Sequence, residues 1–116
     1  MVVLSAKIKI QAEFKSRFLR AGYAMLPLSR AEPGCIEYNF YQDIHDDFAF
    51  HFFEKWSSRE ALQAHFETAH FKQFMEIVEA MVKDAPAVEI FEVASVETLP
   101  APAAPGPEPA PETPTA

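Results

Sequence analysis

The chain has 116 residues, a formal net charge of −7 at neutral pH and an apolar content close to one half. This length fits one domain, and eleven Phe, three Tyr and one Trp supply enough apolar area for a sizeable core. The acidic balance argues against nucleic acid or an anionic membrane as a partner, since both are bound through basic patches. A single cysteine, Cys35, excludes an internal disulfide.

The two ends of the chain differ in composition. The N-terminus has neither the charged region nor the long apolar run of a signal peptide, and no stretch approaches the roughly 20 apolar residues that span a bilayer. We therefore expect a cytoplasmic protein. Seven of the ten prolines follow residue 99, in a segment of mostly Pro, Ala, Glu and Thr. Such a segment cannot bury enough apolar area to offset its ordering entropy, so we expect residues 1–97 to fold and residues 98–116 to form a disordered tail.

The first half of the domain contains a strand and a helix. Residues 2–11 alternate between apolar and polar side chains, with Leu4 and Ile8 on the apolar side, which predicts a strand with one buried face. Apolar residues then recur at helical spacing from Phe14 to Met25. Pro27 is expected to kink or end this helix.

The second half predicts a hairpin, two helical segments and a last strand. Residues 35–42 and 48–56 are strand-like and are separated by a short polar stretch. Ser57 and Glu60 form a capping box that starts a short helix, and Thr68 is placed to restart it before a helical stripe that runs to Val82. Residues 88–96 form the final strand. The order β-α-β-β-α-β is that of an α+β, ferredoxin-like fold.

One sheet face is left without helices in this arrangement, yet it is not polar. The parity of residues 48–56 opposite to Phe52 and Trp56 still carries His51 and Phe53, and Phe91 lies on the corresponding face of the last strand. A solvated face would be more polar. We therefore expect a homodimer in which a second copy covers this face.

Three stretches carry a resemblance to a known family: residues 30–38 match R-x-E-P-G-C-x-x-Y, residues 54–62 match E-x-W-x-S-x-x-A-L, and residues 65–71 match H-x4-H-F. Together they resemble the antibiotic-biosynthesis monooxygenase domain, especially its quinol-oxidising branch, over residues 1–97. The resemblance implies a dimeric α+β barrel with a pocket between sheet and helices in each subunit. It also implies oxidation of phenols or hydroquinones by O2 without metal or flavin. The family includes haem-degrading and non-oxidative relatives, so membership does not fix the reaction.

The chemistry of such a pocket needs a base, and Glu54 is the candidate. It shares its strand parity with Phe52 and Trp56, so it should point at the apolar face, where burial raises its pKa toward a useful range. Trp56 is expected to form a pocket wall. The alternative is that Glu54 is paired with a basic side chain and has no catalytic role.

His65 and His70 lie on or beside the helix that would cap the pocket, and histidine suits proton transfer near neutrality. They could instead hold the helix joint together by hydrogen bonds. We expect no metal site, because five residues of unbroken helix rotate by about 500° and would place the two rings some 140° apart.

Further substrate contacts are expected from polar and aromatic side chains near Glu54. One parity of the second strand should face the pocket and orient a phenolic substrate. The candidates for these contacts are Tyr38, Asn39, Tyr41, Phe52, Trp56, Phe66 and Phe71.

Two functions remain open at this point. The first is a cofactor-independent monooxygenase that acts on a small quinol or phenol. The second is a non-catalytic dimeric barrel that binds a small aromatic ligand or serves in a stress response. Haem binding is disfavoured, because the first strand has Ser5, Lys7 and Lys9 where haem-degrading relatives carry an Asn.

Overall fold

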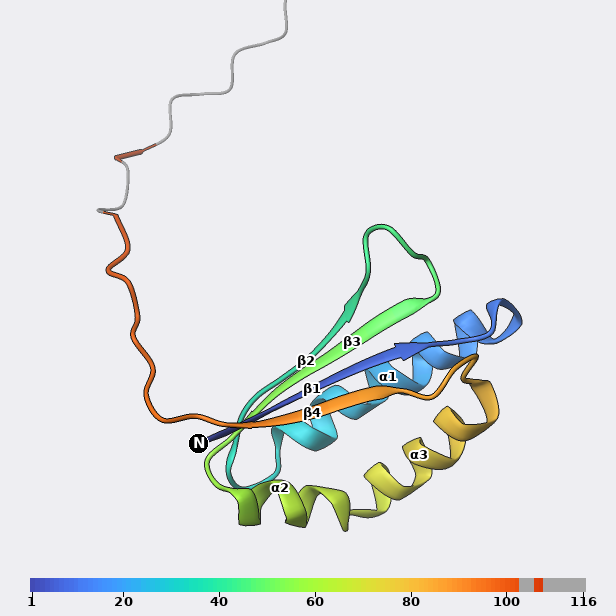
Figure 1. Ribbon diagram of the computed structural model, residues 1–116, viewed down its shortest axis with the longest axis horizontal. Coiled ribbons are helices and arrows are strands. Elements are labelled where there is room, and N and C mark those ends of the chain that lie inside the picture. Colours follow the sequence, from blue (N-terminus) through green and yellow to red (C-terminus); the bar gives the residue numbers. More distant parts are fainter. Residues whose placement is uncertain (103–105, 108–116) are drawn as a thin grey trace, which may run out of the picture.

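The computed structural model describes residues 1–102 and 106–107, and the fold lies within residues 2–92. Most of the tail predicted to be disordered lies outside the described residues. The elements are β1 (Val2–Lys9), a 3-10 helix η1 (Ala12–Phe14), α1 (Lys15–Arg30), β2 (Cys35–Gln42), β3 (Ala49–Trp56), α2 (Arg59–Phe66), α3 (Ala69–Met81) and β4 (Ala87–Glu92). The predicted β-α-β-β-α-β order is therefore confirmed, with α2 and α3 forming the second helical part (Figure 1).

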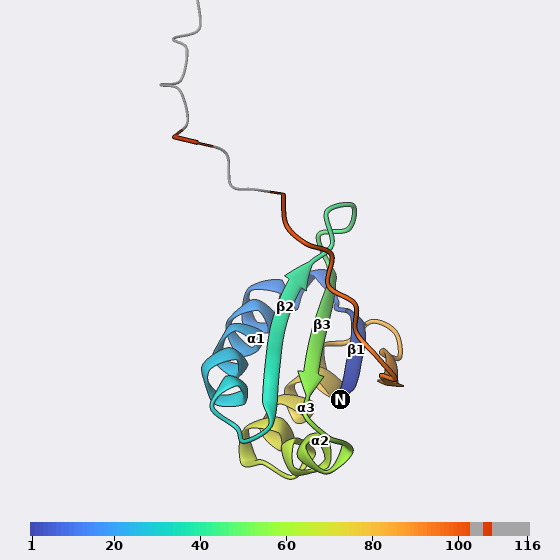
Figure 2. The ribbon, with the colours of Figure 1, turned by 90° about the vertical axis from the view of Figure 1, so that its left-hand side faces the viewer.

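The four strands form one sheet in the order β2-β3-β1-β4, with all neighbouring pairs antiparallel. The helices lie on one face of this sheet, as Figures 1 and 2 both show. In the described part of the chain no helix combines the length and apolar character needed to cross a bilayer.

The core fills the space between the sheet and the helices, as the alternation of residues 2–11 predicts. Leu4 and Ile8 face the helices from β1 and are about 95% buried. Opposite them Phe18 of α1 stacks at an angle on Phe50, with ring centroids 5.0 Å apart. Burial of large aromatic side chains is the main stabilising contribution in such a small domain.

Two local details differ from the sequence expectations. Of the two effects expected of Pro27, a kink or the end of the helix, the end does not occur, because α1 runs on to Arg30. Pro27 is exposed, so the hydrogen bond it cannot make is lost on the solvent side. The cap of α2 is Ser58 rather than Ser57, since the Ser58 side chain accepts from the Ala61 N–H at 3.1 Å. The restart at Thr68 is confirmed: its side chain caps α3.

The turn before β2 depends on Gly34, which has a φ of +84°. A Cβ at this position would lie 2.6 Å from the Ala61 Cβ and 2.7 Å from the Ser57 Oγ. We expect Gly34→Ala to lower the free energy of unfolding by roughly 2–4 kcal/mol, because backbone strain and overpacking act together. Denaturant unfolding measures this loss. Gly106→Ala is the matched control, because nothing lies within 4 Å of that site; equal stability of both variants would contradict the prediction.

The other face of the sheet is open and partly apolar. Phe53 and Phe91 lie on it, with Phe91 47% exposed. We propose that a second copy of the chain covers this face, as the sequence pattern suggested. Phe91→Asp should then shift light scattering at micromolar concentration from a dimer mass to a monomer mass. Leu28→Asp on α1, which is 50% exposed, should leave the dimer intact; a monomer mass for the unaltered protein would refute the proposal.

Candidate functional site

A cavity of about 440 Å³ lies between the sheet and α3, and we call it the inner cavity. Its walls come from all four strands or their ends and from both α2 and α3. Its lining includes Leu4, Tyr38, Phe52, Glu54, Phe71 and Val78. Glu54 is the charged side chain in an otherwise largely apolar lining, so it is the group in the cavity that can accept a proton near neutrality.

Glu54 occupies a strongly desolvated position near the end of β3. The residue is 4% exposed, and its Oε1 accepts a hydrogen bond of 3.0 Å from the Trp56 Nε1–H. Burial raises the pKa of the Glu54 carboxyl to about 7, with a smaller raising effect from the charge of Glu32 and a lowering effect from the Trp56 hydrogen bond. The predicted upward shift agrees with this, and the carboxyl changes its charge in the range useful to a general base.

The raised pKa of Glu54 makes stability depend on pH. Between its ordinary value of 4.5 and about 7, the folded chain binds this proton while the unfolded chain releases it, so stability falls as pH rises. Between pH 4.5 and about 7, the free energy of unfolding of the unaltered protein should fall by on the order of 2–3 kcal/mol relative to that of Glu54→Gln. Denaturant unfolding of both proteins at equal concentration measures the difference, and a difference that stays constant with pH would contradict the assignment.

His65 lies directly behind Glu54 and is 1% exposed. Its Nδ1 lies 2.6 Å from Glu32 Oε2, and its Nε2 lies 3.8 Å from Glu54 Oε1, which is too long for a direct hydrogen bond. Burial lowers the pKa of the His65 ring, and the nearby Glu32 opposes this only in part. A neutral His65 bonded to an ionised Glu32 carries its proton on Nδ1, because a carboxylate can only accept.

His70 completes a cluster of two histidines and two glutamates, with Glu32 at its centre. Its Nε2 lies 2.8 Å from the same Glu32 oxygen that His65 contacts. The expectation that two rings five residues apart point away from each other is wrong, because the helix is not continuous: α2 ends at Phe66 and α3 begins at Ala69. The nitrogens of the two rings and the Glu32 oxygen lie within 4.8 Å of one another, a set that could hold a metal ion.

The structure divides the predicted site residues into three groups. Those that line the inner cavity are Tyr38, Phe52, Glu54, Phe66 and Phe71. Those that lie behind its wall without lining it are Trp56, His65 and His70. Trp56 is fully buried, so it is a support for Glu54 rather than an open wall. Burial and the nearby charge of Glu54 raise the pKa of the Tyr38 hydroxyl, which therefore stays protonated and can donate.

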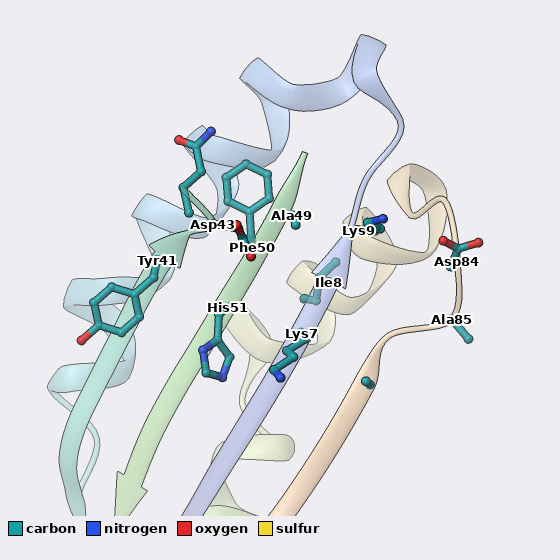
Figure 3. A pocket seen from close by; sticks show the side chains of 12 residues that line it. Lys7, Ile8, Lys9, Tyr41, Asp43, Ala49, Phe50, His51, Asp84 and Ala85 are labelled. Atoms are coloured by element: carbon teal, nitrogen blue, oxygen red, sulfur yellow. The ribbon is translucent and has the colours of Figure 1, made fainter. Parts of the chain in front are cut away.

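The structure does not bring Asn39 and Tyr41 to the inner cavity. Asn39 pairs with Phe53 and Tyr41 with His51 on the opposite face of the sheet. Tyr41 and His51 line a separate hollow of about 550 Å³ there, together with Lys7 (Figure 3). Asn39 accepts a hydrogen bond from Arg30 Nη2 at 3.3 Å. The expected contact of these two residues with a substrate in the same pocket as Tyr38 is therefore wrong for this cavity.

Sequence reasoning missed Glu32. It lies in the turn between α1 and β2, directly before Pro33 and Gly34, and its side chain is 10% exposed. The only signal available was its place in the R-x-E-P-G-C stretch, since nothing local shows that it meets helix residues more than thirty positions later.

Comparison with known proteins identifies the chain. A family model described as antibiotic biosynthesis monooxygenase matches residues 1–77. The chain belongs to this family. The Bacillus subtilis protein YcnE is 36% identical over 75 residues, covering 65% of this chain and 79% of that protein. An uncharacterized protein of Synechocystis sp. is 36% identical over 98 residues, covering 84% of this chain and 67% of that protein.

Solved structures of the family superpose well on this fold. A crystal structure of an antibiotic biosynthesis monooxygenase has a TM-score of 0.77 at 26% identity and covers 82% of this chain and all of its own. The structure of PA3566 from Pseudomonas aeruginosa has a TM-score of 0.74 at 30% identity, covering 81% of this chain and 94% of its own. The ferredoxin-like fold predicted from the sequence is thus that of the family.

Proposed function

We propose that this family member is a cofactor-independent monooxygenase that oxidises a small quinol or phenol with O2. One observation carries the proposal: a nearly buried carboxyl with a pKa of about 7 lies in the wall of an apolar, aromatic-lined cavity. A base of this kind can accept the proton of a phenolic hydroxyl at neutral pH. The relative from Bacillus subtilis is named as a candidate monooxygenase, which agrees in reaction class.

The proposed reaction needs no external reductant. Glu54 removes a proton from the substrate hydroxyl, and the resulting electron-rich anion transfers an electron to O2. Recombination forms a carbon–oxygen bond, and cleavage of the O–O bond releases the second oxygen atom as water. A hydroquinone then leaves as a hydroxyquinone, and a phenol leaves as a quinone. The substrate supplies all four electrons that O2 accepts.

The residues around Glu54 fit these steps. Trp56 holds Oε1 of the carboxylate, so a substrate hydroxyl would meet the other oxygen. Tyr38 lines the same cavity and pairs across the sheet with Glu54, so its ring contributes to the wall next to the proposed base. Phe52, Phe66 and Phe71 provide aromatic surface against which a flat ring can pack and exclude water.

Oxygen uptake with a panel of hydroquinones and phenols in chelator-treated buffer tests the proposal. We expect enzyme-dependent uptake of one O2 per substrate consumed, with incorporation of one atom of isotopically labelled O2 into the product. Binding of the same compounds without uptake would support the alternative function, a non-catalytic barrel for a small aromatic ligand, and would overturn the monooxygenase.

A further inference from the structure

We propose that Glu32, His65 and His70 form a binding site for one divalent transition-metal ion such as Zn²⁺, separate from the inner cavity. None of the three residues lines that cavity, so binding of an ion there can be measured apart from the proposed oxidation. Two imidazoles and one carboxylate are a ligand set that zinc accepts in proteins, with water in the fourth position.

We call Glu32, His65 and His70 the triad. The distances among their ligand atoms suit an ion after a small adjustment of the side chains. Glu32 Oε2 lies 2.6 Å from His65 Nδ1 and 2.8 Å from His70 Nε2, and the three atoms all fall within 4.8 Å. A tetrahedral ion with bonds of about 2.0–2.2 Å holds its ligand atoms roughly 3.3–3.5 Å apart. The two separations from the Glu32 oxygen are shorter than this value, so the carboxylate would move away from both rings by several tenths of an ångström when an ion binds. An ion would replace the protons that now join the rings to the carboxylate.

The surroundings of His65 resemble the support that metal-bound histidines receive. With Nδ1 directed to the triad, its Nε2 faces Glu54 Oε1 at 3.8 Å, and Glu54 is itself fixed by Trp56. A carboxylate that accepts from the second ring nitrogen orients such a ligand and strengthens it, and Glu54 would reach that range by a shift of about 0.6 Å. The buried His65 and the Glu32 side chain at 10% exposure are held firmly, whereas His70 at 19% leaves an open side for water and for entry of the ion.

The three ligands of the triad come from different segments of the chain. Glu32 belongs to the turn after α1, His65 to the end of α2, and His70 to the first turn of α3. A bound ion would add a link among these three segments, beside backbone hydrogen bonds such as those from Thr68 N–H to the His65 carbonyl and from Ser57 N–H to the Gly34 carbonyl. It should therefore stabilise the folded chain by an amount that rises with the logarithm of its free concentration above Kd.

The test uses the full-length protein without a histidine tag, stripped with chelator and titrated with Co²⁺ and then Zn²⁺. We expect one ion per chain, visible Co²⁺ absorption that Zn²⁺ displaces, and a rise in thermal midpoint with added Zn²⁺. Glu32→Gln and His70→Ala should each weaken binding by at least ~100-fold, because loss of even a supporting residue costs about 10–100-fold. His70→Ala keeps the test decisive if Glu32→Gln fails to fold, since its side chain is partly exposed.

His45→Ala and His51→Ala are the matched controls, because both histidines lie away from the triad. Both should bind Co²⁺ like the unaltered protein. Binding below one ion per chain at millimolar Co²⁺, or binding that is lost in His45→Ala but kept in His70→Ala, would overturn the proposal and leave the triad as a hydrogen-bonded clamp. These readouts do not depend on oxidation, so failure of one proposal is distinguishable from failure of the other.

Discussion

Replacing Glu54 with Gln should lower the turnover of a hydroquinone by about 10²- to 10⁴-fold while the domain remains folded, since this is the usual contribution of a general base. Glutamine preserves the volume of the side chain and can still accept from the Trp56 indole N–H. It cannot remove a proton from the substrate. The change therefore distinguishes the role of Glu54 as a base from its role as a hydrogen-bond partner of Trp56.

Turnover as a function of pH sharpens this prediction. With its pKa at about 7, the Glu54 carboxyl is mostly protonated in mildly acidic buffer and mostly ionised above neutrality. For the unaltered protein, kcat/KM of the proposed oxidation should rise as pH increases through this value. The residual activity of Glu54→Gln should lack that rise, apart from any ionisation of the substrate itself.

Glu76→Gln supplies the control, because it makes the same replacement at an exposed position on α3. It should leave both turnover and its pH profile unaltered. Unchanged oxygen uptake in Glu54→Gln would remove the carboxyl from the chemistry and leave the inner cavity as a binding site.

The fold could be predicted because its signals are local. The alternation in residues 2–11 and the helical stripe before Val82 both show which side chains face the core, because core-facing residues recur every few positions along a strand or helix. The local pattern gave the wrong residue where two neighbouring serines could both act as the N-cap of α2. Ser57 and Ser58 are both good caps, and only the exit of the chain from β3 determines that Ser58 is used.

The candidate site could be predicted only in part, because it is built from contacts between distant segments. Glu54 was predictable from strand parity, since its neighbours Phe52 and Trp56 mark the buried face. The inclusion of Asn39 and Tyr41 among the expected substrate contacts has a different cause, because the sequence left open which parity of the second strand faces the pocket. Alternation shows that Tyr38 and Asn39 point in opposite directions, but only the pairing of Tyr38 with Glu54 shows which of them meets the base.

The burial of Glu32 is the clearest example of a feature that the local sequence does not reveal. A glutamate in a turn is ordinarily solvated, and burial of this one depends on the break between α2 and α3, which turns both histidine rings toward it. The break itself was predicted from Thr68. The effect of this break on the directions of the His65 and His70 rings was not predicted, because those directions were derived for a continuous helix.

Removal of the buried ring in His65→Ala should lower the free energy of unfolding by about 3–5 kcal/mol, since it leaves a cavity and takes a hydrogen bond from the Glu32 carboxylate. His70→Ala should cost only about 1 kcal/mol, because its ring is partly exposed and water can replace it at the same oxygen. Denaturant unfolding at one protein concentration measures both losses.

The coupling between His65 and Glu32 identifies the source of that loss. If the hydrogen bond of 2.6 Å between them carries a large part of it, the double variant Glu32→Gln/His65→Ala should lose less than the sum of the two single variants, by roughly 1–3 kcal/mol. Turnover of His65→Ala, corrected for its folded fraction, then shows whether the ring also positions Glu54. A loss below about 1 kcal/mol on removing this buried side chain would contradict the packing seen here, and additive losses would assign the stability of the cluster to volume rather than to its hydrogen bonds.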